Sequence, residues 1–118
     1  MSLIVSRLAG AASTILVVRV PPQLVDDTAS LLRAEVASRL PNADGAGVVL
    51  DFAQVELINS IGITCLLQIQ DQCRRLNSAM YLAAVPEPIQ TFLSQLKLLK
   101  RFPAFPSVED ALAAMDRE

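Results

Sequence analysis

The run VVLDF at 48–52 constrains the fold most strongly, because it is short and almost entirely apolar. A run of this kind is typical of a strand covered on both faces of a sheet, where inward and outward positions are equally apolar. The stretch MYLAAV at 80–85 has the same character, and a helical pattern separates the two. Strands that alternate with helices in this way predict an α/β domain in which helices cover a sheet.

The rest of the chain supplies the other strands of this sheet and its helices. The opening residues 3–20 are predicted to form two strands around Gly10, and 15–20 is the clearer because it is β-branched and ends at Pro21-Pro22. Helices are expected over about 26–40, over about 61–76, from a first turn at 86–88, and from Ser107 through Ala114, with a short strand at 102–105. Prolines confine that last strand to a sheet edge. The total is about four to five strands and about four helices.

Polar residues mark the ends of several of these elements. Asp26, Asp27 and Thr28 place acids and a hydroxyl at the start of the first helix, where the positive helix terminus favours them. Asp51 closes the 48–52 strand and is expected to accept a hydrogen bond in a turn or helix cap. Asn77 follows the 61–76 helix at a position where a left-handed cap residue is expected.

The composition indicates one domain over residues 1–118. Apolar residues make up 53% of the chain and aromatic residues 4%, so the core is expected to be aliphatic. No uncharged apolar run approaches the roughly 18 residues of a membrane span. The chain also lacks the basic leader of a secretory signal peptide. A cytoplasmic protein of bacterial type, without direct membrane insertion, is the expectation.

Charge and residue usage exclude several functional classes. The net charge is −2 and the basic residues are dispersed except at Arg74-Arg75 and Lys100-Arg101, which argues against a nucleic-acid partner. Histidine is absent, which removes serine–histidine and cysteine–histidine pairs and most zinc sites. Cys65 and Cys73 fit small buried hydrophobes better than a metal or disulfide motif. We therefore predict no catalytic residue, no metal and no cofactor, and a protein that is not an enzyme.

The stretch LINSIGITCLL at 57–67 is the main candidate for a functional site, because it places Asn59, Ser60 and Gly62 in an apolar run. One interpretation is a helix cap, in which Asn59 or Ser60 accepts a hydrogen bond from an unpaired N–H and Gly62 allows tight packing. A serine nucleophile is disfavoured, because no histidine exists and Ile58 replaces the first glycine of the G-x-S-x-G motif. A phosphate-binding loop would need more glycine and a lysine.

A second interpretation of the same stretch is a phosphoacceptor at Ser60. Phosphorylation adds about −1.5 to −2 charges, which is comparable to the whole net charge of −2. The helix dipole tolerates that charge at a helix N-terminus, so the fold need not change. A partner docked over the serine would meet a bulky, solvated dianion. The residues alone leave the cap and the phosphoacceptor both open.

The sequence VVLDFAQVELINSIGITCLL is similar to the central signature of the STAS domain family. In that family an aliphatic strand ending in Asp is followed by a loop and by Asp-Ser-Ser/Thr-Gly at the head of a helix. The resemblance continues through MYLAAVPEPIQTFLSQLKLLKRFPAFPSVEDALAAM, so it covers essentially the whole chain. It implies a single STAS-like α/β domain with a mixed sheet of about four to five strands and about four helices.

The resemblance to stand-alone anti-sigma-factor antagonists implies a switch in transcription regulation. Ser60 matches the family's phosphorylated serine and Gly62 its glycine. The unphosphorylated antagonist would bind an anti-sigma factor that is also a serine kinase of GHKL type. Phosphorylation would release this partner, and a PP2C-type phosphatase would restore binding.

The site departs from the family pattern in two respects. Asn59 stands where the family has Asp, and Ile61 where it has a second hydroxyl residue. Gln23 and Leu24 lie in the segment that approaches the switch serine in the family, so both are predicted at the partner surface. The alternative function is a non-switching STAS adaptor, as a subunit of a lipid-transport ABC complex or in a stress-sensing scaffold.

Overall fold

The computed structural model describes residues 5–9, 14–39 and 47–116. The strands are β1 (Val5–Ala9), β2 (Thr14–Arg19), β3 (Gln23–Leu24), β4 (Gly47–Asp51), β5 (Leu57–Ile58), β6 (Met80–Ala83) and β7 (Ala104–Phe105). The helices are α1 (Asp26–Arg39), α2 (Ser60–Arg75), α3 (Glu87–Gln95) and α4 (Val108–Asp116). No helix in these described ranges is long and apolar enough to cross a membrane.

Five strands form the main sheet in the order β1-β2-β4-β6-β7. β1 runs antiparallel to β2, and the other neighbours are parallel, so the sheet is mixed as predicted. The parallel strands are joined by helical crossovers, which is how consecutive parallel strands must be connected. β7 lies at an edge, which confirms the prediction from its flanking prolines.

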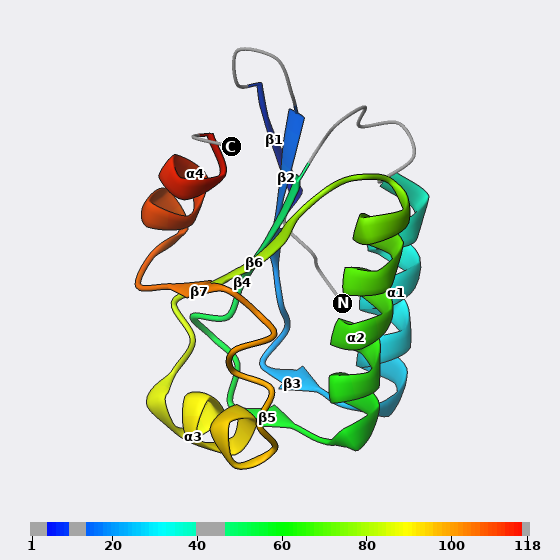
Figure 1. Cartoon of the computed structure of the whole chain (residues 1–118). Helices are drawn as coiled ribbons and strands as arrows, with labels where there is room; N and C mark the ends of the chain where they lie inside the picture. Colours follow the sequence, from blue (N-terminus) through cyan, green and yellow to red (C-terminus); the bar gives the residue numbers. More distant parts are fainter. Residues whose placement is uncertain (1–4, 10–13, 40–46, 117–118) are drawn as a thin grey trace.

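The two central strands are buried on both faces, because helices cover both (Figure 1). Val48 and Leu50 of β4 pack in the larger core with α1 and α2, while Val49 packs in the smaller core with α4. Side chains of a strand alternate between faces, and here both faces are apolar. This arrangement explains why 48–52 has no polar alternation.

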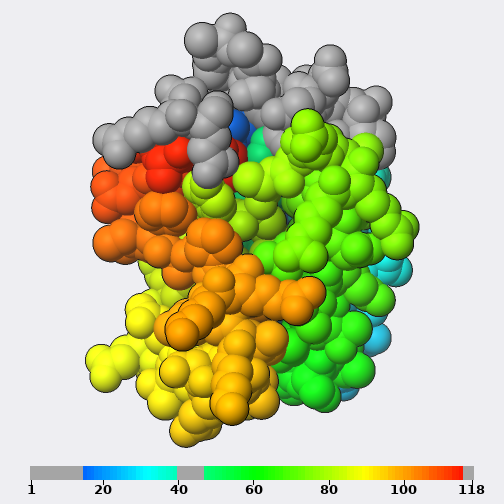
Figure 2. Space-filling model, viewed as in Figure 1, coloured from blue at the N-terminus to red at the C-terminus, as the bar shows by residue number. Residues whose placement is uncertain are grey.

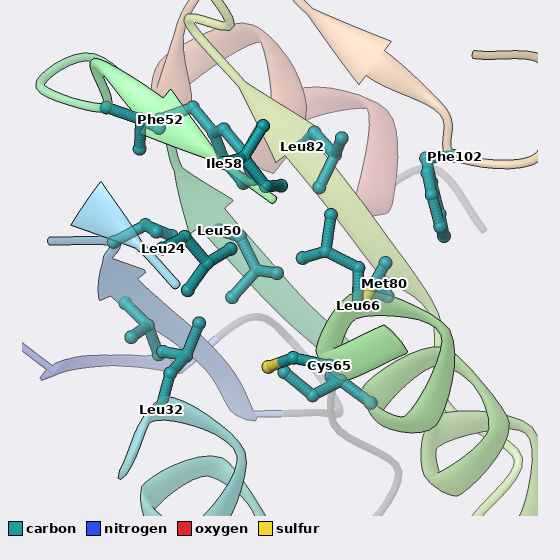
Figure 3. Packing of buried hydrophobic residues seen from close by; sticks show 14 of the residues in the cluster. Leu24, Leu32, Leu50, Phe52, Ile58, Cys65, Leu66, Met80, Leu82 and Phe102 are labelled. Atoms are coloured by element: carbon teal, nitrogen blue, oxygen red, sulfur yellow. The ribbon is translucent and has the colours of Figure 1, made fainter. Parts of the chain in front are cut away.

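The larger core is aliphatic, with phenylalanine at its ends (Figure 3). It contains the following labelled residues: Leu24, Leu32, Leu50, Phe52, Ile58, Cys65, Leu66, Met80, Leu82 and Phe102. Cys65 and Cys73 are free and buried, which confirms that they are packing residues. Burial raises the pKa of each thiol from 9.0 to about 11. Such thiols remain protonated and poorly nucleophilic at neutral pH.

A polar contact fixes α2 against the loop between α3 and β7. The buried Gln70 side chain donates from Nε2 to the Arg101 carbonyl oxygen at 2.7 Å. In return, Arg101 Nε donates to Gln70 Oε1 at 3.2 Å. Figure 2 shows these two segments, coloured green and orange, lying against each other on one face of the molecule. Gln70 is buried with both ends of its amide paired, as a buried polar side chain must be.

A second, two-stranded parallel sheet of β3 and β5 lies at the end of the domain where α1 and α2 begin (Figure 1). The Pro22 carbonyl oxygen accepts from the N–H groups of Glu56 and Leu57, at 2.7 and 3.1 Å. Leu24 pairs with Ile58 in the register. No pattern in the sequence predicts this sheet, because each of its strands has only two residues. Because each strand is followed directly by a helix, the pairing brings the two helix starts together.

Candidate functional site

Asn59 is the N-cap of α2. Its backbone is extended, with φ −119° and ψ −172°, and its side-chain Oδ1 accepts a hydrogen bond from the Gly62 N–H at 3.1 Å. The Asn59 carbonyl oxygen accepts the first helical bond, from the Ile63 N–H at 3.0 Å. Of the two capping residues that the sequence allowed, the structure selects Asn59. The Ser60 hydroxyl is therefore not needed to begin the helix.

Gly62 allows α2 to start directly against β3. A Cβ atom at this position would collide with the Leu24 carbonyl oxygen and lie 2.8 Å from Ile58 Cγ1. A backbone oxygen cannot turn aside as a flexible side chain can. The glycine is thus required by close packing, which confirms that interpretation of the sequence.

Ser60 is exposed at the first position of α2. Within the described ranges, its hydroxyl has no hydrogen-bond partner, while its carbonyl oxygen accepts from Thr64 Oγ1 at 3.0 Å. Leu57 and Ile61, which flank it in the sequence, are 50% and 47% exposed. Ser60 thus presents a free hydroxyl in a segment that also carries two exposed large apolar side chains.

Asp26 belongs to the same site, although the sequence analysis treated it only as a charge at the start of a helix. Asn59 Nδ2 donates to Asp26 Oδ1 at 3.1 Å, across 33 positions of sequence. Asp26 has φ 33°, a left-handed conformation that aspartate tolerates better than most residues. We found no sequence signal for this contact, because it depends on the pairing of β3 with β5.

The two residues predicted at the partner surface differ in exposure. Gln23 is exposed, whereas the Leu24 side chain is completely buried in the larger core. The expectation that Leu24 presents its side chain to a partner was therefore wrong. Adjacent residues of a strand point to opposite sides, so only one of this pair can face outward.

The segments that lead into α1 and α2 carry acidic residues, but the start of α2 itself does not. Asp26, Asp27 and Glu56 are exposed, and the first turn of α2 contains no acidic residue. The free N–H groups and dipole of α2 can thus interact favourably with a negative group placed on Ser60.

The remaining polar candidate, Asp51, has a structural role. Its Oδ1 accepts from the Ala53 N–H at 3.0 Å, which confirms the predicted turn acceptor. Among the residues that the structure describes, no three cysteine or acidic side chains lie together as a metal site would require. What the described site presents chemically is the exposed hydroxyl of Ser60 at the start of a helix.

A model of the STAS domain matches residues 9–111 of the sequence. The chain belongs to the STAS domain family. The match includes β3, β5 and the start of α2, so the site lies inside the STAS domain. A search of curated protein sequences gave no match.

Three solved structures illustrate the fold of this STAS domain. An anti-sigma-factor antagonist domain protein from Planctomyces limnophilus is 17% identical with TM-score 0.81, and the match covers 96% of this chain and 97% of that one. The second is the anti-sigma factor antagonist SpoIIAA, a Bacillus cell fate determinant, in its unphosphorylated form. It is 12% identical with TM-score 0.81, and the match covers 99% of this chain and 98% of that one. The murine Solute Carrier 26 family member A9 anion transporter is 18% identical with TM-score 0.76, over 91% of this chain and 18% of the transporter. At sequence identities this low, the similarity shows only that these proteins share a fold.

Proposed function

We propose that this STAS domain is a cytoplasmic anti-sigma-factor antagonist whose partner binding is controlled by phosphorylation of Ser60. The unphosphorylated protein binds an anti-sigma factor that is also a serine kinase of GHKL type. Phosphorylation releases that partner, and a PP2C-type phosphatase reverses the modification. The observation that carries this proposal is the exposed Ser60 hydroxyl, which is free of any capping role and flanked by exposed Leu57 and Ile61.

The physical basis of the switch is the cost of burying a charge. Leu57 and Ile61 offer apolar area that a partner gains by covering. A phosphoryl group between them would place about −1.5 to −2 charges in that interface. Burying such a charge without a cationic partner is strongly unfavourable, so the complex would dissociate while the domain remains folded.

The proposal is supported by similar structures that are themselves anti-sigma-factor antagonists. The Planctomyces limnophilus protein is an anti-sigma-factor antagonist domain protein, and SpoIIAA has been solved in both unphosphorylated and phosphorylated forms. The phosphorylated form also resembles this chain, with TM-score 0.72. A STAS fold that exists in both forms is compatible with a modification that changes binding and leaves the fold intact.

The test is affinity capture from the native host with wild type, Ser60→Ala and Ser60→Asp as baits. Wild type and Ser60→Ala should retain an ATPase of GHKL type, and Ser60→Asp should not. Gln68→Glu is the matched control, because it adds one charge at an exposed position of the same helix and should retain the partner. Thermal unfolding should show all four folded, with Ser60→Ala within about 0.5 kcal/mol of wild type because Asn59 provides the cap.

Two outcomes would contradict the proposal. If both Ser60 variants unfold, Ser60 is a structural residue. If all baits retain the same transporter ATPase or scaffold protein, the protein is a non-switching adaptor. A similar fold occurs within an anion transporter, so a STAS domain that serves as part of a transport protein has a structural precedent.

A further inference from the structure

The side chain of Asn59 joins two segments that are distant in the sequence. Its Oδ1 accepts from the Gly62 N–H in the first turn of α2, and its Nδ2 donates to Asp26 Oδ1 at the start of α1, both at 3.1 Å. An amide side chain suits this place because it carries an acceptor and a donor together. An ionised carboxylate could accept from the Gly62 N–H but has no proton to donate to Asp26.

The fold holds Asp26 beside Asn59, the residue that directly precedes the phosphoacceptor. In the register of the small sheet the last pair is Leu24 with Ile58, and a helix begins two residues after each of them, so the starts of α1 and α2 lie close together. The close approach of Gly62 to the Leu24 carbonyl oxygen fixes the start of α2 against β3. These two contacts position the start of α1 against α2, and the hydrogen bond from Asn59 then places the Asp26 carboxylate.

We propose that Asp26 is a charge-setting residue of the Ser60 switch, and that Asn59 holds its carboxylate next to the phosphoacceptor. This inference rests on the proposed function, because it assigns a regulatory element to the same serine. Ser60 would then belong to a site made of two segments, β3–α1 and β5–α2. A kinase, phosphatase or partner that approaches Ser60 meets the Asp26 carboxylate at the same time.

Opposing charges act on a phosphoryl group at Ser60. The N–H groups at the start of α2 stabilise its dianionic form. The Asp26 carboxylate disfavours the dianion, because like charges at short range oppose one another. Asp27 and Glu56 are also exposed and acidic, but neither forms a hydrogen bond with Asn59 in the described structure. Asp26 should therefore affect the phosphate more than either of them does.

The test uses full-length protein with phosphoserine installed at position 60 during synthesis, so no kinase is needed. The second pKa of the phosphate, ordinarily about 6, is measured by 31P NMR in wild type, Asp26→Asn and Asp27→Asn. Asp26→Asn removes the charge but keeps an acceptor for Asn59 Nδ2, and asparagine tolerates the φ of 33°. The side-chain amide signals of Asn59 report whether that hydrogen bond is kept in each variant.

Asp26→Asn should lower the phosphate pKa by about half a pH unit, and by at least about twice as much as Asp27→Asn. Equal shifts in the two variants, or no shift in either, would overturn the inference even if the capture experiment supports the switch. The two failures can be told apart, because the NMR comparison depends on Asp26 and the capture experiment depends on Ser60.

Discussion

Replacing Asn59 by aspartate should destabilise the protein, against the usual rule for helix starts. Aspartate caps helices about as well as asparagine, and its charge at a helix N-terminus contributes about 0.3–1 kcal/mol of stability. Asn59→Asp keeps the oxygen that accepts from Gly62. However, it removes the donor to Asp26 and places a second carboxylate where Nδ2 lies, 3.1 Å from Asp26 Oδ1.

The magnitude follows from these opposing effects. A hydrogen bond of this kind contributes about 0.5–1.5 kcal/mol. Two like charges about 4 Å apart in water repel by about 1 kcal/mol. Together these two losses exceed the gain from the helix dipole, so the free energy of unfolding should fall by about 1 kcal/mol. In the Asp26→Asn background the repulsion is absent and the new amide can donate to the carboxylate, so Asn59→Asp should be neutral or slightly stabilising.

Urea unfolding of wild type, the two single variants and the double variant measures this coupling as a double-mutant cycle. The same cycle with Asp27→Asn is the control and should show a coupling near zero. High salt should reduce the penalty of Asn59→Asp, because the carboxylates are exposed to solvent. If Asn59→Asp is as stable as wild type, or costs the same in both Asp26 backgrounds, the proposed arrangement of Asn59 and Asp26 is wrong.

Three further predictions concern the packing around the site and the core. Gly62→Ala should lower the free energy of unfolding by about 1–3 kcal/mol in urea, because the added methyl group collides with the backbone of β3. This loss should outweigh the better helix propensity of alanine, and a variant more stable than wild type would refute the prediction. Because burial raises the pKa of Cys65 and Cys73 to about 11, stability from the protonated thiols is fully present below pH 9 and is lost as the pH rises towards 11. The Cys65→Ala/Cys73→Ala variant should lose less stability between pH 8 and pH 10, and an identical loss would contradict this assignment. Gln70→Ala should lower stability by about 1–3 kcal/mol in thermal unfolding, because it leaves the Arg101 carbonyl oxygen unpaired. The control Gln68→Ala, at an exposed position of the same helix, should cost under about 0.5 kcal/mol. Similar costs in the two variants would refute the role of the Gln70 contact.

The parts of the fold predicted from sequence are those with local patterns. The apolar runs at 48–52 and 80–85 correspond to β4 and β6, because a strand that is buried on both faces has apolar residues at nearly every position. The cap of α2 and the left-handed Asn77, with φ 57°, follow from the chemistry of single residues. These features depend little on distant parts of the chain.

The features that the sequence did not predict depend on distant contacts. β3 and β5 have two residues each, too few to show an alternation, and they are stabilised by pairing with one another. The role of Asp26 and the burial of Leu24 both follow from that pairing. Leu76 and Leu96 continue the apolar spacing of the two helices in the sequence, yet both are exposed because α2 ends at Arg75 and α3 at Gln95.

The Asn59 amide also changes how the departure from the family pattern is understood. The sequence shows only that a charge is absent at this position. The structure shows that the amide oxygen accepts a hydrogen bond from Gly62 and that the amide nitrogen donates one to Asp26. The Asp26 carboxylate therefore lies next to the Asn59 side chain. A negative charge beside position 59 is thus supplied by a different segment of the chain.

The central claim is that a phosphate on Ser60 abolishes binding of the partner that the unmodified protein holds. Its most direct test is calorimetric titration of the captured anti-sigma factor with protein that carries either serine or phosphoserine at position 60. The account predicts that phosphoserine weakens binding by at least about 100-fold, because an uncompensated charge in an interface costs several kcal/mol. Affinities that agree within about twofold, which is under 0.5 kcal/mol, would contradict it.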